Sequence, residues 1–217
     1  MLKYYVYISA TKVNMLYPQI PPAFLRGAEA ELKINLGVIS TSVKGRGPEE
    51  ATELPARVAA VQSYLRKENA VGSIENPRQW TEGTMPMRWG RVSEEASDIA
   101  FFGGVAGKKR VALIGSSDSL IGTPQSAEAN HGGLYYQLKF FNAINPMLES
   151  KGFKAGDSTL TAPHEESSVM QNNYSSLVGI ALDALPSSEQ SLDFLALVLQ
   201  NEPNLIVATP LYVALAT

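Results

Sequence analysis

The sequence predicts one α+β domain spanning residues 1–217, with a mixed, largely antiparallel sheet, a central β-meander and about four packing helices. Three observations support this fold class. Short runs in which apolar residues alternate recur along the chain, and alternation is the period of a strand. Two such runs flank a glycine-rich segment, which is typical of an antiparallel hairpin. Longer stretches carry apolar residues every three or four positions, which indicates helices that cover a sheet.

The first quarter of the chain predicts two strands separated by a break. Apolar residues alternate over 2–8 and again over 32–38, which predicts a strand in each place. Three prolines within 17–22 exclude a regular helix or a fully paired strand there. A short helix or turn is expected over 22–26.

A helix is predicted from Thr52 to about Asn69, because Thr52 can cap the first turn and an apolar stripe follows it. The stripe consists of Leu54, Val58, Val61 and Leu65. We expect this stripe to contact the sheet, and we assign it no other role.

Three further strands are predicted over 80–92, 99–102 and 110–114. The last two flank segment 103–108, whose three glycines predict the turn of a hairpin. This antiparallel connection disfavours a doubly wound parallel sheet, which needs alternating strands and helices.

Helical patterns then alternate with a polar segment. An apolar stripe over 134–148 indicates a helix that Pro146 should kink, or divide after Asn145. Small polar residues over 155–168 predict a mobile loop. Another helix is expected over 169–185.

The end of the chain predicts one more helix and a last strand. The helix would begin at Ser187 or Ser188, because Ser187 and Gln190 have the spacing of a capping box. Its apolar stripe would be Leu192, Leu195, Ala196 and Leu199. The nearly continuous apolar run over 205–213 predicts a strand buried on both faces, in which Pro210 must lie at a bulge, an edge or a strand end.

The composition argues against several classes of function. The formal net charge of −3 disfavours a protein that coats nucleic acid. The absence of cysteine excludes disulfides and thiolate metal sites. The uncharged apolar stretch at the end, 203–217, is shorter than the about 20 apolar residues that span a bilayer. We expect a cytoplasmic protein without a membrane anchor, and no motif predicts a cofactor.

The best candidate for a binding site is the turn that follows the run 110–114. It is bounded by glycines, which permit unusual backbone angles, and its serine hydroxyls and backbone N–H groups could line one concavity. The candidate ligand-binding residues are Gly115, Ser116, Ser117, Ser119 and Gly122, with His131 nearby in the sequence. Such a concavity suits a phosphate, a carboxylate or a nucleotide. The alternative is a tight turn whose serines bond to their own backbone.

An enzymatic hypothesis uses two of these residues. Ser116 would be the nucleophile of an ester or phosphoester hydrolase, and His131 would take its proton. The nucleophile-elbow pattern Gly-x-Ser-x-Gly is absent, so no catalytic residue is assigned.

Three other polar clusters have simpler explanations. The segment 103–109 resembles a phosphate-binding loop but lacks the required first glycine and final Ser or Thr. The basic run Lys108-Lys109-Arg110 is expected to protect a strand edge from aggregation. With Arg88 and Arg91, which flank Trp89, it could instead hold a nucleic-acid backbone, but the acidic net charge disfavours this. His164 and the two glutamates after it lack a further metal ligand, so we predict a solvated loop and no metal.

Three stretches together resemble a family of known proteins. They are residues 5–21, residues 101–122 with their FFGG, LIGSS and LIG motifs, and residues 208–215, ATPLYVAL. The chain resembles an uncharacterised bacterial family of unknown function, found mostly in actinobacteria. The resemblance implies a bacterial, cytosolic accessory part of a signalling or conflict system, and no activity comes with it.

We expect a binding module for a small anionic ligand or a protein partner, acting as an accessory or sensor protein. The serine hydrolase is one alternative. Another is an assembly subunit or homo-oligomer, in which the apolar strand around Pro210 lies at a sheet edge and pairs with another chain.

Overall fold

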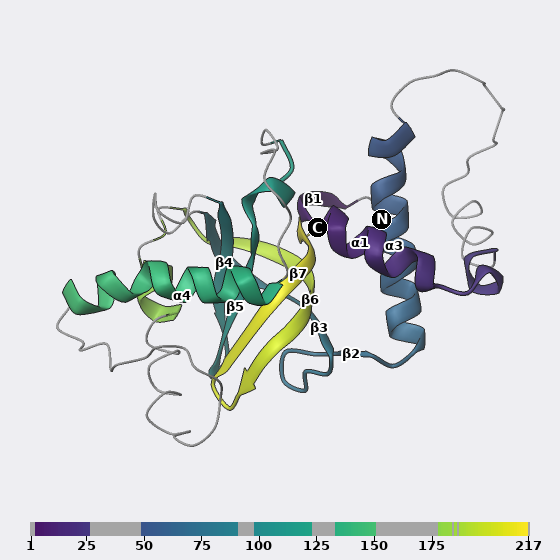
Figure 1. Ribbon diagram of the computed structural model, residues 1–217. Coiled ribbons are helices and arrows are strands. Elements are labelled where there is room, and N and C mark those ends of the chain that lie inside the picture. The colour runs from purple at the N-terminus through teal and green to yellow at the C-terminus, as the bar shows by residue number, and fades with distance from the viewer. Residues whose placement is uncertain are drawn as a thin grey trace.

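The computed structural model describes residues 3–26, 49–90, 98–122, 133–150, 178–183, 185 and 187–216 (Figure 1). Its strands are β1 (Tyr4–Ile8), β2 (Val71–Gly72), β3 (Trp80–Gly90), β4 (Ile99–Ala106), β5 (Lys109–Ser116), β6 (Gln190–Glu202) and β7 (Leu205–Leu215). Its helices are α1 (Ala10–Leu16), η1 (Tyr17–Gln19), α3 (Glu49–Lys67), η2 (Ser117–Ser119) and α4 (Gly133–Ser150), and residues 178–183 and 22–26 are also helical. The α+β prediction is confirmed.

Five strands close into a barrel. β3, β4 and β5 form the predicted antiparallel meander. β5 then pairs in parallel with β7, β7 pairs antiparallel with β6, and β6 returns antiparallel to β3. β1 and β2 extend the sheet beside β7 and β3. The sheet is largely antiparallel, as predicted. Its closure into a barrel was not predicted from the sequence.

Alternate residues of each barrel strand point inward and fill the interior. Three aromatic rings meet in it: Tyr7 contacts Phe102 edge to face, and Trp89 stacks on Phe102, each pair with centroids 5.7 Å apart. Gly83 and Gly115 lie at inward positions where larger side chains would collide with this filling. The core is packed and is not a channel.

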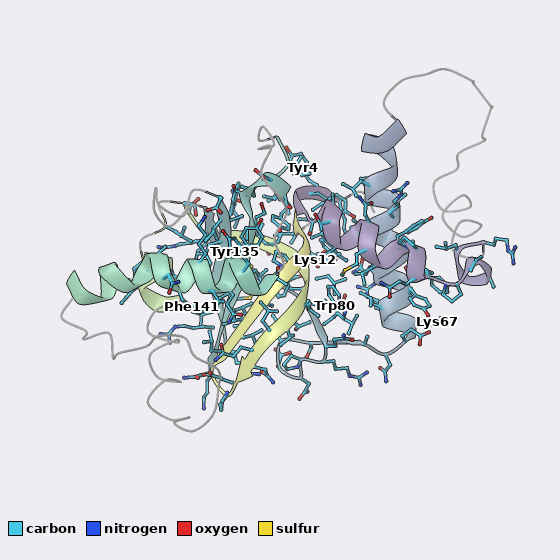
Figure 2. All side chains as sticks on the ribbon, viewed as in Figure 1. Tyr4, Lys12, Lys67, Trp80, Tyr135 and Phe141 are labelled. Atoms are coloured by element: carbon cyan, nitrogen blue, oxygen red, sulfur yellow. The ribbon has the colours of Figure 1, made fainter. Side chains whose placement is uncertain are left out.

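Helices cover the barrel on two sides (Figure 1). α4 and residues 178–183 bury the outer face of β4, β5 and the first half of β7. α1 and α3 bury the outer face of β6 and the second half of β7, where the predicted stripe residues Val58 and Val61 are fully buried. Tyr135 and Phe141 on α4 thus lie across the sheet from Lys67 at the end of α3 (Figure 2).

β1 fills a gap in the barrel wall. β5 and β7 pair only through residues 110–113 and 205–208. Beyond that point β1 pairs with the second half of β7, and on its other edge the Val6 carbonyl accepts the N–H of Ile121 at 2.9 Å. Tyr7 is bridged there to Leu120. β1 therefore lies between β7 and the segment that follows β5, and Tyr7 enters the end of the barrel.

The helix predicted from Ser187 or Ser188 is wrong, because these residues precede strand β6. β6 pairs with β3 and with β7 over most of its length. The helical spacing of Leu192, Leu195 and Ala196 arose because nearly every residue of the run is apolar. Leu192 faces the barrel interior and Leu195 faces the cluster under α3, so both faces are buried and periodicity cannot distinguish a strand from a helix.

The last strand is confirmed, but the edge position proposed for it is wrong. β7 is flanked by β6 on one side and by β5 and β1 on the other. The pairing register with β6 shifts by one residue between Leu195–Tyr212 and Ala196–Pro210. Pro210 is tolerated because it lies at this bulge.

Other predictions changed in detail. The hairpin between β4 and β5 is confirmed, but Gly103 and Gly104 lie within β4, and only Gly107, with φ of 59°, takes a turn conformation. α4 runs through Pro146 without division after Asn145. The strand over 32–38 and the loop over 155–168 lie outside the described residues, and α1 was not predicted.

Two absences hold for the described part of the chain. None of its helices is long and apolar enough to cross a membrane. Within the same residues, no group of three or more His, Cys, Asp or Glu side chains is placed to hold a metal ion.

The contact between Tyr7 and Gly115 yields a stability prediction. A Cβ at Gly115 would collide with the hydroxyl of Tyr7, a residue whose side chain is fully buried. We expect Gly115→Ala to lower the free energy of unfolding by about 1–3 kcal/mol, as overpacking does. Urea unfolding measures this loss, and Gly179→Ala is the control because its Cβ meets nothing closer than 3.9 Å.

Removing the hydroxyl tests the cause. In a Tyr7→Phe background, the loss of unfolding free energy caused by Gly115→Ala should be smaller by about 1 kcal/mol than in the native chain, because the clashing oxygen is gone. Equal losses of unfolding free energy in both backgrounds would show that the clash with the Tyr7 hydroxyl is not what destabilises Gly115→Ala.

Candidate functional site

Polar side chains gather around the Tyr7 hydroxyl at the end of the barrel. Ser9 and Ser119 interact with it through their side chains, and Ser116 does so through its backbone. Burial raises the pKa of Tyr7 to about 12, and these partners and the nearby Tyr136 modify that shift. Tyr7 therefore stays neutral under physiological conditions. We call Tyr7, Ser9, Lys12, Ser116 and Ser119 the Tyr7 cluster.

Ser9 is fixed by the junction of β1 and α1. Its N–H donates to the carbonyl of Leu211 on β7 at 2.9 Å. Its side-chain Oγ accepts the N–H of Lys12 at 3.4 Å and so caps α1. The carbonyl of Ser9 accepts the N–H of Val13 at 3.0 Å, and Val13 is fully buried under the helix. These contacts hold the serine between strand and helix with 5% of its surface exposed.

Lys12, on the first turn of α1 (Figure 2), adds one charged group to the cluster. Its Nζ donates to Ser9 Oγ at 3.4 Å. Loss of solvation lowers the pKa of Lys12 to about 8. Asn14, two residues further along the helix, reaches Arg57 of α3. Since residues two apart point to nearly opposite sides of a helix, Lys12 faces away from α3.

The surroundings of Lys12 differ from those of three other cations. Lys3 lies 2.5 Å from Asp193, Arg66 lies 2.7 Å from Glu82, and Lys139 lies 2.6 Å from Asp98. Within the described residues, the Lys12 ammonium contacts a serine hydroxyl and no carboxylate. A cation that loses water without gaining an anion is costly, so an anion would be stabilised here.

The predicted turn contributes unequally to the cluster. Ser116 is buried, and its Oγ accepts the N–H of Asp118 at 3.2 Å, which caps η2. Ser117 is also buried and donates its N–H to the carbonyl of Asp98 at 2.8 Å. Ser119 points toward Tyr7.

The two glycines of the turn have different roles. Gly115 lies beneath the Tyr7 hydroxyl, while Gly122 is exposed, with φ of 88° and open space around it. Gly115, Ser116 and Ser119 are thus brought together at Tyr7, and Gly122 is not part of that contact. His131 lies outside the described residues, so ligand binding at this turn and the pairing of Ser116 with His131 remain predictions.

Tyr7, Ser9 and Lys12 were missed in the sequence. A Ser directly after a strand, followed three residues later by a Lys on the first turn of a helix, was the available signal. It went unrecognised because α1 is only seven residues long and ends at the proline-rich break.

A second polar cluster lies beneath α3 and is structural. The Tyr212 hydroxyl accepts from Lys3 at 2.7 Å and from Gln62 at 2.9 Å, and it donates to Asp193 at 3.3 Å. Burial, with the negative charge of Asp193, raises the pKa of Tyr212. Its charges are balanced within the cluster, so it needs no ligand.

The chain belongs to DUF7019, a family of unknown function, whose sequence pattern matches residues 3–217. This match confirms the resemblance to an uncharacterised family. No curated protein and no solved structure matches the chain.

The desolvated Lys12 yields a prediction on stability and pH. Its folded-state pKa of about 8 is below the ordinary value of 10.5, so between these values the unfolded chain binds more protons than the folded one. The free energy of unfolding should therefore gain a rising contribution from about pH 8 to about pH 10.

Lys12→Met removes the pH-dependent contribution of Lys12, so the difference between the native chain and this variant measures it. The stability of the variant relative to the native chain should be greatest below pH 8 and should shrink as pH rises to 10. Urea unfolding at each pH measures it, and measurements stop near pH 10 because ionisation of tyrosines in the unfolded chain then acts in the opposite direction. A stability difference that is independent of pH would contradict the placement of Lys12.

Proposed function

We propose that this chain binds a small anionic ligand at the Tyr7 cluster, with Lys12 as its counter-ion. One observation carries the proposal: the partly buried Lys12 ammonium, whose pKa desolvation lowers, lies beside the Ser9 hydroxyl and contacts no carboxylate within the described residues. A bound anion would supply the missing charge and would raise the pKa of Lys12 toward its ordinary value.

The chemistry of the neighbours favours a carboxylate or a phosphate. The Ser9 hydroxyl lies beside the Lys12 ammonium. The Tyr7 hydroxyl interacts with the side chains of both Ser9 and Ser119. Hydroxyls and an ammonium are donors that bind oxyanions, and charge-assisted hydrogen bonds are the stronger kind.

The position of the site fits a sensor or accessory protein. The cluster joins β1, the first turn of α1 and the segment after β5, which meet only at this end of the barrel. A ligand held by groups from these elements would stabilise their contact. Ligand binding would then change the stability of this end of the fold, and a partner protein could bind the ligand-bound form in preference to the free form.

The proposal predicts stabilisation by simple anions. Phosphate and acetate, added at about 100 times their dissociation constants, should raise the stability by about 2.7 kcal/mol and the unfolding temperature by several degrees. Chloride at equal ionic strength is the reference. Binding should weaken above pH 8, where Lys12 loses its proton.

Two lysine variants separate the site from the general surface charge. Lys12→Met should weaken binding by roughly tenfold or more, because a charge-assisted hydrogen bond contributes about 1.5–3 kcal/mol. Lys108→Met, at the exposed tip of the β4–β5 hairpin, should bind as the native chain does. Equal binding by both variants, or no stabilisation by either anion, would exclude this site.

A further inference from the structure

We propose that Ser9 and Lys12 form a nucleophile and general-base pair that takes an acyl group from a small carboxylic ester. The inference deepens the proposed function at the same site, because hydrolysis of the ester would release a carboxylate, the class of anion that Lys12 is proposed to bind. Binding and reaction require opposite charge states of Lys12, so each can fail without the other.

The geometry of the pair suits proton transfer. Lys12 Nζ lies 3.4 Å from Ser9 Oγ, a distance that commonly shortens when substrate binds. Ser9 is held by the N–H bond to Leu211, and Lys12 by the turn of α1 that Ser9 caps. The Tyr7 hydroxyl is a third group in contact with the Ser9 side chain.

The environment allows Lys12 to act as a base near neutral pH. Desolvation lowers its pKa to about 8, so a substantial fraction is neutral at pH 7.5 to 8. The elements around α1 contribute Tyr7 from β1, Tyr17 from η1 and Arg57 from α3, and Arg57 is directed at Asn14 and the Tyr17 ring. None of these groups is a carboxylate that would restore the ordinary pKa.

The reaction balances without a further reactant except water. Neutral Lys12 takes the proton of Ser9 Oγ while the oxygen forms a bond to the ester carbonyl carbon. The tetrahedral intermediate then breaks its bond to the alcohol oxygen, which takes the proton from the Lys12 ammonium and leaves as the alcohol. Water, deprotonated by Lys12, attacks the acyl carbon. The bond from that carbon to Ser9 Oγ then breaks, Oγ takes the proton back from the Lys12 ammonium, and the acid is released.

The sequence Ser9-Ala10-Thr11-Lys12 has the Ser-x-x-Lys spacing used by one class of acyl-transfer enzymes. Here the spacing places Lys12 on the first turn of α1, the helix that Ser9 caps. The Ser-Asp-Asn and Lys-Thr-Gly motifs that accompany it there are absent from this chain. The inference therefore rests on the geometry and desolvation of the pair.

The test is acetylation of the full chain by p-nitrophenyl acetate, a small neutral ester chosen because Ser9 is only 5% exposed. Intact mass should show one added acetyl group, and peptide mapping should place it on Ser9. The rate of p-nitrophenol release should rise with pH through about 8 and level off. Acetate should slow the reaction below pH 8 by occupying the site.

Variants assign the roles and separate this inference from anion binding. Lys12→Arg keeps the charge but cannot act as a base, so it should bind acetate and lose acetylation by roughly 100-fold. Ser9→Ala should also lose acetylation, with circular dichroism checking that the capped helix still folds. Thr11→Ala, an exposed neighbour on α1, should react as the native chain does.

Three results would overturn the inference. Acetylation of surface lysines alone would show that Ser9 is not a nucleophile. Equal rates for the native chain and Lys12→Arg would remove Lys12 as the base. A native chain that binds acetate but shows no acetylation at any pH up to 9.5 would leave the anion site standing and exclude the acyl transfer.

Discussion

The contact between the Tyr7 hydroxyl and Gly115 fixes the end of the barrel on which the rest of the site depends. β5 and β7 separate beyond residues 110–113 and 205–208, and β1 enters the gap between them. The Tyr7 ring then packs on Phe102 in the interior, an aromatic contact worth about 0.5–1.5 kcal/mol beyond its area. Because only glycine leaves room for the phenol oxygen, the end of β5 and the end of β1 specify each other.

That packing also determines where the charged group lies. β1 ends next to Ser9, whose backbone is tied to Leu211 and whose hydroxyl begins α1. Lys12 follows after one turn, beside the Ser9 hydroxyl and away from α3. A basic side chain is therefore held in a partly buried position by the same contacts that close the barrel. The polar cluster around Tyr212 shows the contrasting arrangement, in which each cation has a carboxylate.

Much of the fold was accessible from the sequence. The meander of β3, β4 and β5, the strand β1 and the stripe of α3 follow from alternation or helical spacing, and β7 follows from its nearly continuous apolar run. The closure of the barrel was not accessible, because it depends on which distant strands pair. β6 was assigned to a helix because its apolar run satisfies both periods when both faces are buried.

The site was only partly accessible. The hydroxyl-rich turn drew attention to Gly115, Ser116 and Ser119, and these three do lie at Tyr7. Lys12 could not be connected to them, because the partners meet across more than a hundred residues of chain and the shift of its pKa arises from burial rather than from its neighbours in sequence. The order of residue types along the chain does not show which lysine is buried in the folded protein and desolvated there.

The most direct measurement is the pKa of Lys12 itself. Carbon-13 labelling of lysine side chains, with the Lys12 resonance assigned by its loss in Lys12→Met, allows a titration by NMR in a buffer free of oxyanions. We expect a pKa of about 8 for Lys12 that rises when phosphate is added. A pKa near the ordinary 10.5, unchanged by phosphate, would show that Lys12 is solvated and would contradict both the anion site and the nucleophile–base pair.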